Sequence, residues 1–112
     1  MENLLNKEPV KRVQDFIAQF DPKLKVLSLN TTARTAKDAA ESLGCEVGAI
    51  VKSLVFRADD TFLICLVAGD KRCSLNKLKK VINKKDVCMA NADQVKINTG
   101  FSIGGVAPVA HL

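Results

Sequence analysis

Lys52 is a candidate for binding an anionic group. It lies one residue into the apolar run Val51–Ala58 and is the only charged residue between Glu46 and Arg57. An ammonium in such a strand must be paired or in water, because burying an unpaired charge is costly. At the mouth of a pocket, the ammonium could hold a phosphate as a point charge. A lysine at a strand edge that faces solvent would account for the same pattern.

The second candidate segment is the glycine-rich sequence Gly104-Gly105-Val106-Ala107-Pro108. Its glycines allow the backbone to approach a ligand closely and to adopt dihedral angles that other residues avoid. The proline fixes the backbone where the chain leaves the loop. Backbone N–H groups of such a loop could stabilise the carbonyl oxygen of an ester as it gains negative charge during attack. A tight turn between two strands is the alternative interpretation.

The sequence contains no convincing pair of nucleophile and base. Ser53 follows Lys52, but the only histidine is His111, close to the last residue. Four cysteines occur without C-x-x-C spacing: Cys45, Cys65, Cys73 and Cys88. Short ligand spacings mark most zinc sites, so we expect no metal and no cofactor. We expect free thiols in the core in preference to catalytic or disulfide-bonded cysteines.

Hydrophobic periodicity predicts the elements that would position these residues. In chain order they are a helix from about Pro9 to Phe20, a strand Leu24–Leu29, a helix Ala36–Leu43, strands Val51–Ala58 and Thr61–Ala68 joined as a hairpin, a helix after Ser74, a strand Asp86–Ala90 and a short helix after Asn91. Thr35, Ser74 and Asn91 are predicted N-caps. The second hairpin strand is apolar on both faces, so we expect both faces to be covered.

Lysines are concentrated on the helix that follows Ser74. The helical spacing predicts an inward apolar face of Leu75, Leu78, Val81 and Ile82, and an outward face of Lys77, Lys79, Lys80, Lys84 and Lys85. The whole chain has 17 basic and 12 acidic residues, a formal charge of +5. This field would attract a polyanion such as RNA. A solvated helix face is the alternative.

The length and composition indicate one globular domain. The 112 residues suit a single domain over residues 1–112, and 47% of them are hydrophobic. Strands and helices mixed in this order predict an α/β or α+β domain, with a mixed, mostly antiparallel sheet surrounded by helices. No apolar run reaches the ~18 residues that a membrane span needs, and the first residues do not read as a secretory signal. We therefore expect a cytoplasmic protein that does not bind membranes.

Three separated segments resemble the YbaK/prolyl-tRNA-editing domain family, in the order in which that family has them. They are TARTAKDAAESLGCEVGAIVKSLVF, LVAGDKRCSLNKLKKV and ADQVKINTGFSIGGVAPVAHL. The resemblance covers the chain from about Val10 to its end. It implies an aminoacyl-tRNA deacylase, which hydrolyses the ester bond of a mischarged tRNA. The implied partners are aminoacyl-tRNA and an aminoacyl-tRNA synthetase.

The resemblance also assigns roles by residue. The family lysine of the I-x-K-[ST]-L motif corresponds to Lys52, and the G-x-x-x-P loop to Gly104–Pro108. The implied catalytic set is Lys52, Gly104, Gly105 and Pro108. The implied substrate-binding set is Lys52, Ser53, Gly104, Gly105, Val106 and Ala107. The motif G-D-[KR]-R is a weaker match, at Gly69–Arg72. Separately, the lysine face of the helix after Ser74 is a candidate track for the acceptor stem of the tRNA, so the suggested tRNA contacts are Lys71, Arg72, Lys77, Lys80 and Lys84.

The sequence departs from the family pattern after the glycine-rich loop. Family members usually continue for a further strand, helix and strand, whereas this chain stops at Leu112. The usual glycine two residues after the motif proline is Ala110. We expect the apolar segment Phe101–Leu112 to be an exposed edge or to be covered by a second copy of the chain, which predicts a homo-oligomer.

The sequence is compatible with three functions. The first is a deacylase that acts on mischarged tRNA in trans. The second is a non-catalytic module that binds tRNA or a synthetase and has lost activity with its C-terminal elements. The third is a general RNA-binding domain, which is weaker because the chain has five Phe and no Tyr or Trp to stack on bases.

Overall fold

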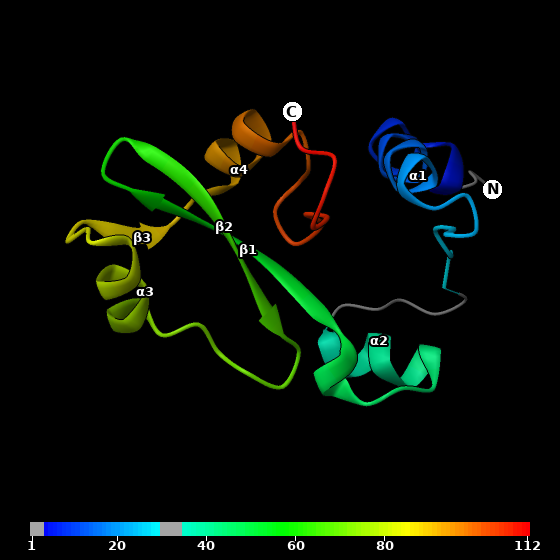
Figure 1. The fold of residues 1–112 in the computed structure, drawn as a ribbon, viewed down its shortest axis with the longest axis horizontal. Coiled ribbons are helices and arrows are strands. Elements are labelled where there is room, and N and C mark those ends of the chain that lie inside the picture. Colours follow the sequence, from blue (N-terminus) through cyan, green and yellow to red (C-terminus); the bar gives the residue numbers. More distant parts are fainter. Residues whose placement is uncertain (1–3, 30–34) are drawn as a thin grey trace.

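A computed structural model describes residues 4–29 and 35–112. In chain order this part contains η1 (Leu4–Asn6), α1 (Glu8–Phe20), α2 (Ala36–Leu43), η2 (Val47–Ala49), β1 (Val51–Ala58), β2 (Thr61–Ala68), α3 (Leu75–Ile82), β3 (Val87–Met89) and α4 (Ala92–Thr99). Figure 1 shows α3 and α4 on opposite sides of the sheet, and α2 beyond the end where β1 begins. The predicted mixed α/β class is confirmed.

The sheet is antiparallel, with the strand order β2-β1-β3. Strand β1 pairs with β2 over its whole length, from Val51 opposite Ala68 to Ala58 opposite Thr61. Strand β3 pairs only with the last three residues of β1, Phe56–Ala58. The predicted hairpin is therefore confirmed. The first half of β1 has no described strand on its β3 side.

Alternation along the strands divides the core into two clusters, one on each face of the sheet. On one face Phe56, Ala58 and Val87 are buried, and Leu78 and Ile82 of α3 pack against them. On the other face, Val55 is buried with Ala90 and with Val95 of α4, and Val106 packs against this cluster from the C-terminal segment. The β1 residues that contact α3 thus alternate with those that contact α4.

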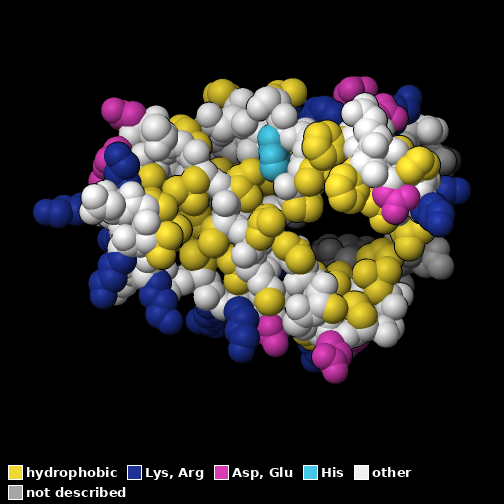
Figure 2. Space-filling model, viewed as in Figure 1, with side chains coloured by type: hydrophobic (Ala, Val, Ile, Leu, Met, Phe, Trp, Pro, Cys, Tyr) yellow, Lys and Arg dark blue, Asp and Glu magenta, His cyan; other side chains and the backbone are white. Residues whose placement is uncertain are grey.

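Strand β2 is covered less completely than its apolar sequence led us to expect. Leu63 and Cys65 pack toward α3, and Phe62 and Ile64 toward the α4 cluster. Leu66, however, is 56% exposed. Figure 2 shows hydrophobic side chains spread over the sheet on the viewed face. The described residues therefore cover one face of β2 only in part.

Side-chain caps begin three of the helices where the sequence predicted them. Thr35 Oγ1 accepts a hydrogen bond from the backbone N–H of Asp38, and Ser74 caps α3 in the same way. Asn91 and Gln94 form a reciprocal capping box at the start of α4. These bonds satisfy backbone donors that have no partner within the helix.

The predicted strand Leu24–Leu29 is wrong. This segment has no described partner strand, and a side chain of α1 holds it instead. Gln14 accepts a hydrogen bond from the backbone N–H of Val26 (2.7 Å) and donates one to the carbonyl of Leu24 (3.2 Å). Alternating apolar residues predict an extended backbone, but only tertiary structure can supply a partner strand.

The predicted inward face of α3 is half correct. Leu78 and Ile82, one helical turn apart, pack on the sheet. Leu75 is 38% exposed and Val81 is 82% exposed. An eight-residue helix over a narrow sheet can bury only one narrow stripe of its surface, so the remaining two apolar residues stay at the surface.

The C-terminal segment folds back onto its own chain, contrary to the expectation of a free edge. Phe101 is buried at 3% exposure, and the backbone N–H of Leu112 donates to the carbonyl of Thr99 (3.2 Å). Arg12 of α1 donates to the carbonyl of Ala110 (2.7 Å) and stacks 4.6 Å from the centre of the Phe101 ring. These contacts hold the segment against its own chain, but Ile103 and Leu112 stay exposed, so the homo-oligomer stays a prediction.

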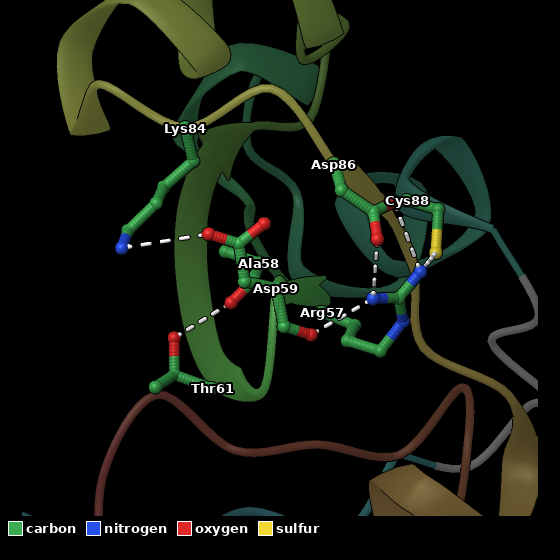
Figure 3. Close-up of polar contacts among 7 residues, drawn as sticks. All are labelled: Arg57, Ala58, Asp59, Thr61, Lys84, Asp86 and Cys88. Carbon is green, nitrogen blue, oxygen red and sulfur yellow. Dashed lines mark hydrogen bonds and ion pairs between the residues drawn. The ribbon is translucent and has the colours of Figure 1, made fainter.

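A polar cluster joins β3 to the hairpin (Figure 3). Both terminal nitrogens of Arg57 donate to the Asp86 carboxylate, at 3.1 and 3.2 Å. Arg57 also donates to the carbonyl of Asp59 (2.8 Å) and to the Cys88 sulfur (3.3 Å). Lys84 lies 3.5 Å from the Asp59 carboxylate. The Arg57 guanidinium, through hydrogen bonds and charge, lowers the pKa of Asp86.

We predict that Asp86→Asn destabilises the fold in a pH-dependent manner. The pKa of Asp86 is lower in the folded than in the unfolded chain, so its contribution to stability is present above the unfolded pKa, near 4. That contribution is lost as the pH falls through the folded pKa. Urea unfolding should show a variant less stable than wild type at pH 7, with the difference shrinking below about pH 4. The exposed turn variant Asp60→Asn is the control, and a pH-independent difference for Asp86→Asn would contradict the assignment.

We also predict that Gly69→Ala destabilises the fold by about 1–3 kcal/mol. A Cβ at Gly69 would clash with the Val47 carbonyl oxygen and lie 3.0 Å from the Cβ of Ala36. Backbone atoms cannot move aside as readily as the end of a side chain. Gly48→Ala is the matched control, because the added atom would meet only the Asp70 carboxyl group. Equal free energies of unfolding for the two variants would show that the Gly69 packing is looser than described.

Candidate functional site

A cleft of about 750 Å³ lies along the open half of β1. Its described lining comes from the start of α2, from η2, from β1, from the turn after β2, from the end of β3, from α4 and from the C-terminal segment. These residues are Thr35, Ala36, Lys37, Ala39, Val47, Ile50, Val51, Lys52, Ser53, Leu54, Val55, Gly69, Met89, Ala90, Val95, Ile103, Gly104 and Val106. Figure 2 shows the hollow bordered by hydrophobic side chains. The volume falls within the range of about 300–1,000 Å³ that is usual for small-molecule sites.

Because β3 pairs only with the end of β1, backbone groups on that edge of the first half of β1 stay without a described partner strand and form one wall of the cleft. The carbonyl of Val55 accepts a hydrogen bond from the N–H of Ala90 (3.0 Å), so the backbone groups of Val55 point to the β3 side. Successive residues of a strand direct these groups to opposite edges. Val51 and Ser53 therefore direct their N–H and C=O groups to the same edge as Val55, where β3 has ended. Such groups can orient a polar ligand.

Lys52 and Ser53 are neighbours in β1, so their side chains point to opposite faces of the sheet. Both residues nevertheless line the cleft. The Lys52 ammonium donates a hydrogen bond to the backbone carbonyl of Lys71 (2.7 Å). An ammonium has three donors, so this bond fixes its position and leaves two N–H groups. No carboxylate of the described residues forms an ion pair with Lys52. Its positive charge is therefore available to an anionic ligand.

The glycine-rich loop is divided between the cleft and contacts elsewhere. Gly104, at φ +80°, and Val106 line the cleft. The N–H of Gly105 donates to the carbonyl of Ser102 (2.9 Å), which closes a tight turn. The turn thus occupies one of the two glycine N–H groups that the sequence suggested for binding an oxyanion. The segment therefore forms a tight turn, although not between two strands, and the binding of an oxyanion by its N–H groups stays a prediction.

Of the remaining loop residues, only Pro108 faces a second cavity. Pro108 lines a cavity of about 460 Å³ together with Asn98 and His111, and Val55 borders both cavities. The carbonyl of Ala107 lies 2.6 Å from Nε2 of His111. Neither Gly105 nor Ala107 lines either cavity. The structure therefore brings Lys52, Ser53, Gly104 and Val106 together, and it places Pro108 next to them.

Ser53 has an unsatisfied hydroxyl group. Its Oγ is buried and has no hydrogen-bond partner among the described residues. A buried hydroxyl without a partner costs about 1–3 kcal/mol. No histidine lines the cleft in the part of the chain described, so the cleft offers no Ser–His pair. The hydroxyl is better suited to accept or donate a hydrogen bond when the cleft is filled.

Two residues near the site were not predicted from the sequence. Lys37, in the first turn of α2, is the second cationic residue of the described lining, which contains no acidic residue. His111 lines the smaller cavity and stacks edge-on against Phe101, with ring centres 5.7 Å apart. One sequence feature could have drawn attention to His111, because it is the only histidine of the chain. No sequence feature pointed to Lys37, because its position at the cleft depends on how α2 packs against β1.

The five basic residues suggested as tRNA contacts lie outside the cleft. Lys71, Arg72, Lys77, Lys80 and Lys84 are all exposed. Within the described ranges, no group of three His, Cys, Asp or Glu side chains could hold a metal ion. The four cysteines are free; Cys65 and Cys73 pack into the α3 side of the core, and burial raises the pKa of the Cys73 thiol. No described helix is long and apolar enough to cross a membrane.

Known proteins with similar sequences include proline–tRNA ligases and an uncharacterised protein. The chain is 30% identical over 102 residues to the proline–tRNA ligase of Caldicellulosiruptor bescii, covering 91% of this chain but 17% of the ligase. It is 31% identical over 100 residues to the uncharacterised protein YwhH of Bacillus subtilis, covering 88% of this chain and 63% of YwhH. The chain thus spans only a small part of the length of the ligases.

The fold and the sequence also match a solved structure. A candidate trans-editing enzyme for prolyl-tRNA synthetase is 40% identical, with a TM-score of 0.86, over 94% of this chain and 67% of that one. The family model described as the aminoacyl-tRNA editing domain matches residues 30–112, a range that includes every described element lining the cleft. The chain belongs to the aminoacyl-tRNA editing domain family.

Proposed function

We propose that this chain is an aminoacyl-tRNA deacylase, which hydrolyses the ester bond between a wrongly attached amino acid and its tRNA. One observation carries the proposal. In a chain of the editing-domain family, Lys52 and Gly104, from segments far apart in the sequence, line the same cleft. The relatives support the same direction, since one is a proline–tRNA ligase and one a candidate trans-editing enzyme.

The chemistry of the cleft suits the aminoacylated end of an RNA. The ammonium of Lys52 binds the phosphate of the terminal nucleotide, and the second cation, Lys37, adds to the positive field. The open backbone edge at Val51 and Ser53 orients the aminoacyl group beside Gly104. A volume of about 750 Å³ has room for an amino acid joined to a nucleoside.

Hydrolysis in this site depends on positioning. The oxygen of a water molecule attacks the ester carbonyl carbon, directly or assisted by a group of the substrate. The bond from that carbon to the ribose oxygen then breaks, and the ribose oxygen takes up a proton. The products are the free amino acid and the uncharged tRNA. Orientation of reacting groups contributes roughly 7–11 kcal/mol in favourable model reactions, which is ample for an ester that is already activated.

A second candidate function is binding of charged tRNA, or of a synthetase, without hydrolysis. The specific observation in its favour is the hydrogen bond from the Gly105 N–H to Ser102, which uses a donor that could otherwise stabilise an oxyanion. A panel of mischarged tRNAs separates the two functions. Release of amino acid supports the deacylase, whereas tight binding with no release supports the binding module.

We predict that Lys52→Met lowers the rate of amino-acid release from the best mischarged tRNA by about 10²-fold. That factor corresponds to roughly 2.7 kcal/mol of lost stabilisation of the bound phosphate and transition state. The substitution keeps the aliphatic part of the side chain, so thermal unfolding should be unchanged. Lys25→Met, at an exposed lysine outside the cleft, is the matched control and should keep full activity. An undiminished rate in Lys52→Met would remove Lys52 from the mechanism.

A further inference from the structure

The net positive charge of the chain is confined to one segment. Residues 69–85 contain seven basic residues and one acidic residue, a net charge of +6. The remaining 95 residues contain ten basic and eleven acidic residues, a net charge of −1. The excess of lysine and arginine is therefore a local property of this segment, and a general need for solubility does not account for its position.

These seven basic side chains form one surface, which we call the basic strip. Six of its members are exposed and one is half-buried: Lys71, Arg72, Lys77, Lys80, Lys84 and Lys85 are exposed, and Lys79 is half-buried. Figure 2 shows the basic side chains gathered along the lower-left margin, over α3 and the β2–α3 connection of Figure 1. Only Lys84 has a described acidic partner, Asp59 at 3.5 Å.

The basic strip begins at the cleft. The carbonyl of Lys71, its first residue, accepts the hydrogen bond from the Lys52 ammonium (2.7 Å). Gly69, two residues earlier, lines the cleft. A polyanion whose end enters the cleft beside Lys52 would therefore have the basic strip next to the point where it leaves the cleft.

We propose that the basic strip binds the phosphate backbone of the double-stranded acceptor part of the RNA whose aminoacylated end lies in the cleft. This inference rests on the proposed function. Lysine ammonium groups suit phosphates, and the strip has no aromatic side chain on which a base could stack. The strip therefore contributes affinity and orientation to many tRNAs, without reading their base sequence.

The strip could alternatively stabilise α3 or bind a protein, and the effect of its lysines on RNA binding distinguishes these roles. Lys79 and Lys80 lie in the last turn of α3, where positive charge compensates the helix dipole. That role concerns stability and involves no RNA. The exposed Val81 beside them could instead belong to a surface for an acidic protein. Neither role makes the salt dependence of RNA binding depend on these lysines.

The first test measures RNA binding against salt. The strip variant Lys77→Gln/Lys80→Gln/Lys85→Gln omits the paired Lys84. The control variant Lys7→Gln/Lys11→Gln/Lys23→Gln removes the same charge from exposed lysines outside the strip. The probe is uncharged tRNA, titrated between about 50 and 200 mM salt. We expect the slope of log K against log salt to fall by about 2–3 for the strip variant and to stay at the wild-type value for the control.

The second measurement separates the strip from the cleft. With aminoacyl-adenosine, a substrate that lacks the duplex, the strip variant should release amino acid as fast as wild type. With full aminoacyl-tRNA its kcat/KM should fall by about tenfold, mainly through a higher KM. Equal salt slopes for strip variant, control and wild type would overturn the proposal. A chain that hydrolyses neither substrate but shows the altered slope would refute the deacylase function and support the strip.

Discussion

Unequal pairing of β1 is the constraint on which the rest of this structure depends. Strand β2 pairs with all eight residues of β1, whereas β3 pairs with only three. The paired end holds the two core clusters, and the bidentate Arg57–Asp86 contact joins β3 to it. The open end borders the cleft. One strand thus provides both the stable centre of the domain and one wall of the candidate site.

The cleft is assembled from segments that are distant in the sequence. Its described walls include α2 and η2 and, from the C-terminal segment, Ile103, Gly104 and Val106. The C-terminal wall is held in turn by Phe101, which is buried beneath the Arg12 guanidinium, and by the Leu112–Thr99 hydrogen bond. The position of Gly104 relative to Lys52 therefore depends on packing contacts that involve neither residue.

The cleft and the basic strip differ in charge and in shape. The cleft is largely apolar and contains two described cations, which suits a small ester-bearing group attached to a phosphate. The basic strip is largely exposed and accounts for the net positive charge of the chain, which suits a long polyanion. The Lys52–Lys71 hydrogen bond joins the two surfaces. A substrate that combines both chemical features, such as aminoacyl-tRNA, matches this arrangement better than either part alone.

The sequence by itself determined the hairpin, the helix caps at Thr35, Ser74 and Asn91, the editing-domain family and the candidate segments around Lys52 and Gly104. These depend on local chemistry: alternation, cap hydrogen bonds and short motifs. Only the tertiary structure decided that residues 24–29 form no strand, that Val81 is exposed, that the Gly105 N–H is occupied and that Lys37 joins the cleft. Strand pairing, burial and pocket walls depend on which distant segment lies alongside, because they are made by contacts between residues far apart in the chain. The Gly105 N–H is bonded locally, to Ser102, and that bond depends on the backbone conformation of the turn.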